Sequence, residues 1–553
     1  MDGFVLLGYA TPTTTRSSSS KNVSLIFVND VQLLLIVGAG IAVAAVARKR
    51  NIEPGMIIVV LAAAASFIPG MPRLELDSEF ILAVVVPPLL YSATRGMSVS
   101  AFGANLRAIV TLGVLLVLLT AGVLGLVAAW LLPAIGAGAF VLGSVLAPPD
   151  TITTVSHGDE IGLPKRVTSI LTGESLVNDA TALTLFSIAI GVVGGEHASW
   201  GHGALELLRN ATVGIAIGGA FAVATLWIRK RLGNPTLETS LVLLVPFTAF
   251  LVAETVHASG ILAVVAAAFL ISINLTLDPK HQYPGAYRTR LQEQAFWPVL
   301  DFVLETFVFA YIGLQLKFVL DDLAHSAQPG LARTLIAAGV LLVVAIVFRL
   351  VAVYLLFGRW TLRNRMVKRR ADRDAAFRDA IERRQQRRGR RGGGQPLDPP
   401  TPKETLLVGW IGMRGIITLA AAGSTPVWVP GRDAILAIAL LVTLGTLLMQ
   451  GTTIGWLTRR LSFDLTAERA HEDELRQRGH QIVAEAARQP ATDPDASFEN
   501  QRLAVGKAVS ERRLTEEVAR ALIEDLDLRQ AATHTMPPIG AGPRPNFPGK
   551  FSA

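Results

Sequence analysis

The sequence predicts an all-α polytopic membrane protein. Of its 553 residues, 51% are hydrophobic and only 17% are charged, whereas about a quarter are charged in an average soluble domain. The apolar residues recur in runs long enough to cross a hydrocarbon core of about 30 Å as helices. One such run, VLLVLLTAGVLGLVAAWLL, lacks the polar–apolar alternation of a membrane β-strand. These observations exclude an ordinary soluble enzyme and favour transmembrane helices.

We expect about thirteen spans. The apolar runs place them at 25–47, 55–72, 78–94, 108–132, 138–157, 167–193, 204–228, 237–256, 258–275, 296–318, 332–357, 405–424 and 433–457. Basic residues gather in alternate loops: Arg48, Lys49, Arg50, Arg95, Arg107, Lys165, Arg166, Arg229, Lys230, Arg231, Arg288, Arg290, Arg459 and Arg460. By the positive-inside rule these loops are cytoplasmic, which puts the N terminus outside and the C terminus inside.

The segments outside the spans divide the chain further. Residues 1–24 are expected to be an external tail, 25–460 the transmembrane domain and 461–553 a cytoplasmic tail. Within the domain, the Arg-rich segment 359–404 is expected to be a solvated cytoplasmic loop that can attract anionic lipid, while nucleic-acid binding is not expected. In the tail, 465–490 and 498–530 are expected to be helices, the second with an apolar stripe of Val509, Leu514, Val518, Leu522 and Leu526. The pattern fits either a regulatory or a dimerising role.

Ionisable groups at membrane depth are costly, so those that persist usually pair or serve transport. The sixth span carries four polar residues, Glu174, Ser175, Asn178 and Asp179, within little more than one helical turn. Ser175 and Asp179 are i and i+4 neighbours, and so are Glu174 and Asn178. The spacing predicts one polar stripe that faces the interior of the helix bundle. The chain has no cysteine, so chemistry at this stripe must use oxygen and nitrogen groups.

Two spans are expected to be interrupted in the membrane. Pro148-Pro149 precede Asp150 in the fifth span, and proline breaks helical hydrogen bonding. The twelfth span has Arg414 among three glycines, Gly409, Gly412 and Gly415. The two spans run in opposite directions, as an inverted repeat requires, and paired interrupted spans indicate the ion site of a transporter. Asp150 can balance exposed helix N-termini and Arg414 exposed C-termini, or either can contact the ion.

For the other charged residues we expect mainly structural or surface roles. Arg349 lies in the apolar eleventh span and needs an anion, for which Glu174 is the leading candidate; the pair is expected to hold two helices in register. Glu305 in the tenth span is expected to support the ion funnel. Glu254 and His257 flank a short turn and are expected to be surface groups.

The run GESLVNDATAL, with APPDTITT before it and WIGMRGIITLA after it, resembles the monovalent cation/proton antiporter family, in its NhaP-type sodium/proton exchanger branch, over residues 25–460. The resemblance implies that Asp179 binds cation and proton alternately and that Ser175 supplies a hydroxyl ligand. Asn178 matches the asparagine that the family associates with electroneutral exchange. It also implies the Glu174–Arg349 salt bridge, the acid and arginine of the crossing helices at Asp150 and Arg414, and a homodimer.

The chain departs from the family pattern at two places. Many relatives have Thr-Asp where this chain has Pro149-Asp150, which removes a threonine from the expected ion shell. Archaeal relatives carry an acid after the Pro-Pro-Leu-Leu stretch of the third span, where this chain has Tyr91 and Ser92. Ion preference therefore does not follow from the resemblance.

The expected function is secondary active antiport of a monovalent cation, first Na⁺, against H⁺ by alternating access, electroneutral at 1:1, in pH and sodium homeostasis. Asp179 and Ser175 would hold the Na⁺, which is cargo, and no cofactor is expected. A bacterial inner or plasma membrane is the expected location. K⁺/H⁺ antiport is the main alternative. A gated cation channel is disfavoured because the polar groups gather at one depth, and an intramembrane enzyme using Glu174 and Asp179 lacks a water-activating metal set.

Overall fold

The computed structural model describes residues 35, 37–47, 49, 54–71, 73, 81–151, 158, 161–195, 200–276, 285–325, 330–374, 377, 383 and 399–535. These residues form helices and their connections, with one isolated antiparallel bridge between Asp150 and Met413. The expected external tail at 1–24 lies outside the described residues. The chain divides into two compact units, Met1–Glu75 with Val303–Phe318, and Leu76–Phe302 with Val319–Ala553.

The first unit contains the helix Val37–Ala47, α2 (Pro54–Ala65) and residues 303–318 of α13 (Ala286–His325). Its helices touch at two glycines, one against a backbone and one against a side chain. Gly313 of α13 lies directly against the carbonyl oxygen of Val59, and Gly40 lies against Thr306. A side chain at either glycine would overlap its neighbour, so this packing depends on their lack of a Cβ.

In the second unit, one set of helices forms what we term the site bundle. It consists of α5 (Val99–Val110), the π-helix η2 (Thr111–Leu116), α6 (Val117–Leu131), α7 (Gly138–Leu146), α9 (Lys165–Val193), α14 (Leu331–Arg373), α16 (Pro402–Trp410), α17 (Ile416–Gly423), α18 (Arg432–Thr446), the π-helix η5 (Leu447–Gly451) and α19 (Thr452–Leu461). Aliphatic residues from α6, α7, α14 and α18 make one continuous core in this bundle. The short helices α7 and α17 contribute residues to that core, which helps to fix where their broken ends lie.

A companion bundle in the same unit has its own packing. It comprises the π-helix η1 (Ile81–Val85), α4 (Val86–Arg95), α10 (Trp200–Leu232), α11 (Pro235–Thr255), α12 (Gly260–Thr276) and residues 286–302 of α13. Its charges neutralise one another: Arg229, which is buried, pairs with Glu293 at 2.8 Å and with Glu238 at 3.5 Å. The hydroxyl of Thr289 donates to Glu238 at 2.9 Å. This buried network ties α10, α11 and α13 together.

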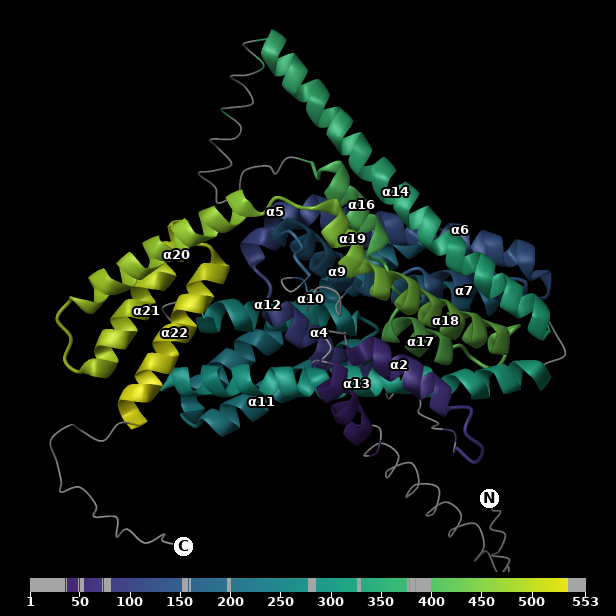
Figure 1. The fold of residues 1–553 in the computed structure, drawn as a ribbon, viewed down its shortest axis with the longest axis horizontal. Coiled ribbons are helices and arrows are strands. Elements are labelled where there is room, and N and C mark those ends of the chain that lie inside the picture. Colours follow the sequence, from purple (N-terminus) through teal and green to yellow (C-terminus); the bar gives the residue numbers. More distant parts are fainter. Residues whose placement is uncertain are drawn as a thin grey trace, which may run out of the picture. The chain divides into compact units, whose positions relative to one another are not determined.

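The tail folds as three helices, α20 (Thr466–Ala487), α21 (Pro494–Ser510) and α22 (Glu516–Thr535), which lie side by side at the yellow end of the colour scale in Figure 1. They share an apolar core that includes Leu514, Val518, Leu522 and Leu526 of the expected stripe. The single helix expected at 498–530 was wrong, because the chain turns between α21 and α22. Arg512 has a φ of 58° there. The turn contains no glycine or proline, so the sequence does not predict it.

Charged contacts join the tail to the rest of the second unit. Arg290 at the start of α13 donates two hydrogen bonds to the buried carboxylate of Asp527, at 2.6 and 2.7 Å. Lys165, the first residue of α9, donates to Glu472 at 2.5 Å. The Arg290–Asp527 pair is the buried one of the two, and loss of either partner of a buried ion pair is strongly destabilising. The tail therefore contacts both bundles.

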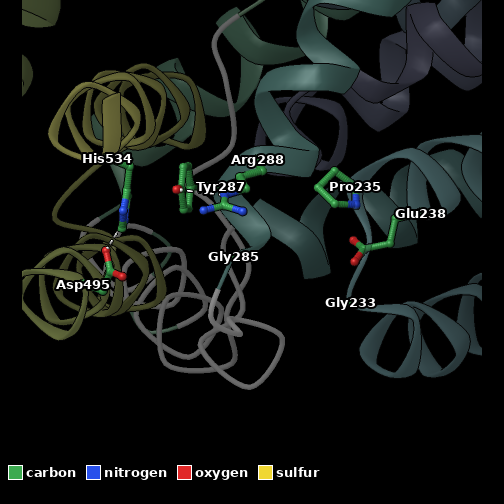
Figure 2. Close-up of a pocket in the computed structure, with 8 residues that line it drawn as sticks. All are labelled: Gly233, Pro235, Glu238, Gly285, Tyr287, Arg288, Asp495 and His534. Carbon is green, nitrogen blue, oxygen red and sulfur yellow. Dashed lines mark hydrogen bonds and ion pairs between the residues drawn. The ribbon is translucent and has the colours of Figure 1, made fainter. Parts of the chain in front are cut away.

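A cavity of about 230 Å³ lies at the junction of the tail with α11 and α13 (Figure 2). His534 stacks on Tyr287 at 5.9 Å between ring centroids and is hydrogen-bonded to Asp495 at 2.8 Å. A hydrogen bond from the Gln530 amide, and then one from His534, hold the pKa of Asp495 below its ordinary value.

Seven helices of the described residues are long and apolar enough to span a membrane, and four further apolar helices are shorter. The multi-pass helical fold expected from the sequence is therefore present. One segment differs: α14 continues through the start of the expected loop 359–404 and ends at Arg373. Arginine, leucine and methionine favour helix, and exposed positive charge does not prevent it. Most of the remaining loop, 375–398, lies outside the described residues apart from 377 and 383.

Candidate ion-binding site

Two broken helices meet inside the site bundle. Helix α7 ends at Leu146, and the prolines that follow keep the chain extended to Asp150. Helix α16 ends at Trp410, and α17 begins at Ile416. The main-chain N–H of Asp150 donates to the carbonyl oxygen of Met413 at 2.6 Å. The two extended segments are therefore paired antiparallel, and both interruptions occur where the sequence predicts them.

The exposed C-terminal end of α7 is capped by Arg414. This side chain is buried, and its Nε donates to the carbonyl oxygen of Leu146 at 3.0 Å. Its Nη1 donates to the carbonyl oxygen of Gly412 in its own segment. The main-chain N–H of Arg414 donates to the Thr446 hydroxyl at 2.9 Å. A guanidinium at a helix C-terminus satisfies unpaired carbonyls and opposes the negative end of the helix dipole.

The C-terminal end of α16 is capped by Arg349 of α14. Its guanidinium donates to both carboxylate oxygens of Glu174, at 2.6 and 3.0 Å, and to the carbonyl oxygens of Val408 and Ile411, at 3.2 and 2.8 Å. Gln450 adds a bond from its amide to the carbonyl oxygen of Trp410 at 2.7 Å. The structure thus pairs Arg349 with Glu174 as expected. The same guanidinium also satisfies carbonyl oxygens at the end of α16.

The opposite end of the second break faces an acid. Asp150 lies so close to Gly415, the residue before α17, that a Cβ at this glycine would overlap its carboxylate. A carboxylate at a helix N-terminus is stabilised by the unpaired N–H groups and the positive end of the dipole. Asp150 and Arg414 therefore sit at helix ends of opposite polarity.

The polar stripe of α9 faces this crossing. Glu174, Ser175, Asn178 and Asp179 are all buried. The amide nitrogen of Asn178 donates to the carbonyl oxygen of Pro149 at 2.7 Å, which ties α9 to the extended segment after α7. Within the described part of the chain, the Asn178 Oδ1 and the Ser175 Oγ are buried and accept or donate no hydrogen bond. Asp179 is close enough to Asp150 for their carboxylate charges to interact.

Buried polar atoms are almost always hydrogen-bonded to protein or water, so unpaired ones call for an explanation. Here a carboxylate, a hydroxyl oxygen and an amide oxygen project from one stretch of one helix, beside the break that follows α7. Oxygen ligands of this kind suit a hard monovalent cation.

The remaining residues of interest lie elsewhere. Glu305 is half-buried in the part of α13 that belongs to the first unit. Glu254 and His257 are exposed at the turn after α11, as expected for surface groups, and the Glu254 carboxylate accepts from the main-chain N–H of Gly260. Gln450 could not be predicted as part of the site, because an amide near the end of an apolar run is a weak signal.

Comparison with known proteins places this geometry in a family. A profile described as sodium/hydrogen exchanger, transmembrane, matches residues 22–460. The chain belongs to the sodium/hydrogen exchanger family. This family consists of transporters and not of enzymes, so the chain is a membrane ion transporter. The match covers the helices of the first unit and both bundles of the second, and it ends before the tail helix α20.

Individual proteins similar to this chain are also described as exchangers or antiporters. An uncharacterised Na⁺/H⁺ exchanger of Mycobacterium tuberculosis is 27% identical over 469 residues, which cover 80% of this chain and 76% of that protein. The Na⁺/H⁺ antiporter ApNhaP of Aphanothece halophytica is 25% identical over 492 residues, or 87% and 85% of the two chains. A Bacillus subtilis antiporter described for sodium, potassium, lithium and rubidium is 27% identical over 412 residues, or 71% of this exchanger and 56% of that one.

The fold also matches a solved structure. The sodium proton antiporter MjNhaP1 of Methanocaldococcus jannaschii superimposes with a TM-score of 0.56 at 16% sequence identity. The match covers 79% of this chain and 99% of that chain. At this identity the match establishes a shared fold. The expectation of an antiporter-like helical architecture is therefore confirmed.

Proposed function

We propose that this exchanger moves one monovalent cation, Na⁺ in the first instance, against one H⁺ at Asp179. The observation that carries the proposal is the buried pair of oxygens, Ser175 Oγ and Asn178 Oδ1, that lack protein partners beside the Asp179 carboxylate among the described residues. Family membership supports cation/proton antiport in general. The identity of the ion and the 1:1 stoichiometry are part of the proposal.

In this proposal some of the site residues bind the cation and the others hold the helices in position. Asp179 and Ser175 supply ligand oxygens to the cation, and protonation of Asp179 removes the charge that attracts it. Asn178 holds the Pro149 carbonyl with its amide nitrogen, which leaves its oxygen for the site. Glu174 with Arg349, and Arg414, keep the helix ends in position, and Asp150 adds negative charge near the ion. Because only a loaded or protonated site changes its exposure, each cycle by alternating access is electroneutral.

Glu305 is proposed to support the funnel, on the basis of its position in a membrane helix alone. A homodimer in a bacterial inner or plasma membrane, with the N terminus outside and the tail in the cytoplasm, belongs to the same proposal. It rests on the family resemblance and on the distribution of basic residues. A role in pH and sodium homeostasis follows from the direction of the gradients in such a membrane.

Potassium is the alternative cargo. The Bacillus subtilis relative is described as an antiporter of sodium, potassium, lithium and rubidium, so this family accommodates larger ions. The shell around Asp179 has Pro149 where many relatives have a threonine, and a main-chain oxygen is less selective in position than a hydroxyl. Exchange measured with Na⁺ and with K⁺ distinguishes the two cargoes.

The test is a pH-gradient dye assay in proteoliposomes, with Na⁺, Li⁺ and K⁺ added separately to wild type and to Asp179→Asn. We expect cation-dependent proton movement in wild type and none in the variant, because an amide cannot exchange a proton for a cation. Asp525→Asn in α22 is the matched control, since that carboxylate is exposed and pairs with Arg529 on its own helix. Residual exchange in Asp179→Asn that matches wild type would remove Asp179 from this role.

A further inference from the structure

A second cavity lies where the tail helix α22 meets the ends of α4, α12 and α13, and it shares no lining residue with the cavity of Figure 2. Its volume is about 230 Å³. Arginines from three different helices line it: Arg95 is the last residue of α4, Arg290 lies near the start of α13, and Arg520 lies in α22. Guanidinium groups gathered around one space form a candidate site for an anion.

One buried carboxylate of the cavity wall, Glu293, is shared between two arginines. It pairs with Arg229 at 2.8 Å and with Arg95 at 3.6 Å. The second distance is longer than a hydrogen bond. Arg229 has Glu238 as another partner at 3.5 Å. The contact with Glu293 therefore does not use the hydrogen-bond donors of Arg95.

The other buried carboxylate of the wall, Asp527, is also shared. It accepts two hydrogen bonds from Arg290, at 2.6 and 2.7 Å, and one from Arg502 at 2.9 Å. The remaining acid that lines the cavity, Glu524, is exposed, so water screens its charge. The buried acids of this wall are thus already occupied by arginines.

Arg520 is the least satisfied group of the cavity. Its Nη1 and Nη2 donate to the main-chain carbonyl oxygens of Arg95 and Met97, at 3.1 and 3.0 Å. Its Nε is buried and has no hydrogen-bond partner in the part of the chain that the structure describes. Burial lowers the pKa of the Arg520 guanidinium; Glu516 and Glu517 act in the opposite direction, and the charge of Arg95 lowers it further. The guanidinium groups of Arg95 and Arg520 therefore repel each other.

The charges on and directly behind this wall do not balance. Five arginines stand against three buried carboxylates: Arg95, Arg229, Arg290, Arg502 and Arg520 against Glu238, Glu293 and Asp527. A phosphate monoester carries a charge of about −1.5 to −2 at neutral pH, which matches this surplus. The planar fork of arginine also fits pairs of phosphate oxygens.

We propose that this cavity binds a phosphate monoester, which accepts hydrogen bonds from Arg95 and Arg520 while Arg290 adds positive charge. The bound group relieves the repulsion between the two arginines and gives the buried Nε of Arg520 a partner. It also ties the tail helix α22 to the end of α4. Because the cavity lies at the ends of apolar helices, the phosphate comes either from a lipid headgroup such as that of phosphatidic acid or from a soluble ion.

The first experiment follows thermal unfolding of the full chain in detergent by tryptophan fluorescence, with inorganic phosphate or with chloride at the same ionic strength. A ligand that binds the folded state raises the midpoint with its concentration, which gives its Kd. We expect phosphate to stabilise wild type, and Arg520→Gln to raise the Kd about tenfold or more, because a charged donor is lost. Arg529→Gln is the matched control, since Arg529 is exposed on the same helix and pairs with Asp525; its Kd should stay within about twofold of wild type.

A second variant keeps the test decisive if Arg520→Gln loosens the tail. Glu524→Gln removes an exposed negative charge from the cavity wall and leaves the contacts of Arg520 in place. We expect it to lower the Kd for phosphate about twofold. An unchanged or higher Kd in Glu524→Gln would overturn the proposal.

The source of the phosphate is distinguished in nanodiscs that contain either phosphatidic acid or phosphatidylglycerol, whose phosphate is a diester. Stabilisation by phosphatidic acid that Arg520→Gln loses and Arg529→Gln retains supports a lipid headgroup, whereas the same pattern with inorganic phosphate alone supports a soluble ion. The proposal is wrong if neither probe stabilises wild type, or if both arginine variants respond as wild type does. None of these measurements depends on exchange at Asp179, so their failure and the failure of the proposed function are separate results.

Discussion

Replacing Arg349 with alanine removes four hydrogen bonds at one buried point. The guanidinium donates to both oxygens of Glu174 and to the carbonyl oxygens of Val408 and Ile411. Its side chain is 3% exposed and that of Glu174 is 0% exposed, so water does not replace these bonds. The variant leaves a buried carboxylate without its counter-charge and two helix-end carbonyls without a donor.

The size of the loss can be divided between these two effects. Breaking a buried ion pair by removing one partner costs about 3 to 5 kcal/mol in unfolding free energy. An unsatisfied buried carbonyl costs about 1 kcal/mol or more. The additional change Glu174→Gln removes the stranded charge but restores no donor to Val408 and Ile411. We therefore expect the double variant to recover about half of the stability that Arg349→Ala loses.

The assay is a double-mutant cycle of unfolding in detergent, followed by tryptophan fluorescence. A coupling free energy of about 2 kcal/mol between the two positions is expected. The matched control is the exposed pair Asp525 and Arg529 on α22, whose oxygen and nitrogen are 2.5 Å apart. Exposed pairs four residues apart contribute only about 0.3 to 0.5 kcal/mol. Purely additive losses at Arg349 and Glu174, or a coupling no larger than that of the control pair, would refute this reasoning.

Two other substitutions address the helix break and the tail. Gly415→Ala should lower the rate of exchange at least tenfold, because the new methyl group would overlap the Asp150 carboxylate and push α17 away; initial rates in proteoliposomes measure this, and an unchanged rate would contradict the close approach. Asp527→Asn should lower the thermal stability of the protein by about 2 kcal/mol in unfolding free energy, because Arg290 is left buried with a weaker acceptor. Asp525→Asn on the same helix should have an effect within about 0.5 kcal/mol, and equal effects of the two would argue against a buried anchor.

The crossing of the broken helices could be predicted because its causes are local. Two consecutive prolines stop α7, and three glycines around Arg414 stop α16, whatever surrounds them. The choice of Glu174 as the partner of Arg349 also followed from the sequence, since few anions occur at membrane depth. The pairing itself is observed, while the roles of these residues in transport remain proposals.

Features that depend on surroundings could not be read from the sequence. The end of α14 was predicted to be a loop because its arginines are unfavourable to packing. A solvated helix needs no packed neighbour, so the helix continues to Arg373. The turn at Arg512 depends on how α21 and α22 meet in the tail core and has no residue signal of its own. The hydrogen bond from Ser92 of α4 to Asp301 of α13 joins residues 209 positions apart. One sequence gives no indication that these two helix faces meet.

The cap on α7 has a consequence for how the chain is made. The carbonyl oxygen of Leu146 receives its bond from Arg414, 268 residues later. A ribosome that has inserted α7 into the membrane must therefore synthesise nearly half of the protein before that helix end acquires its permanent donor. During this interval the short helix depends on water or the insertion machinery. Chains that end prematurely before Arg414 should be recognised as unfinished, however well their individual helices insert.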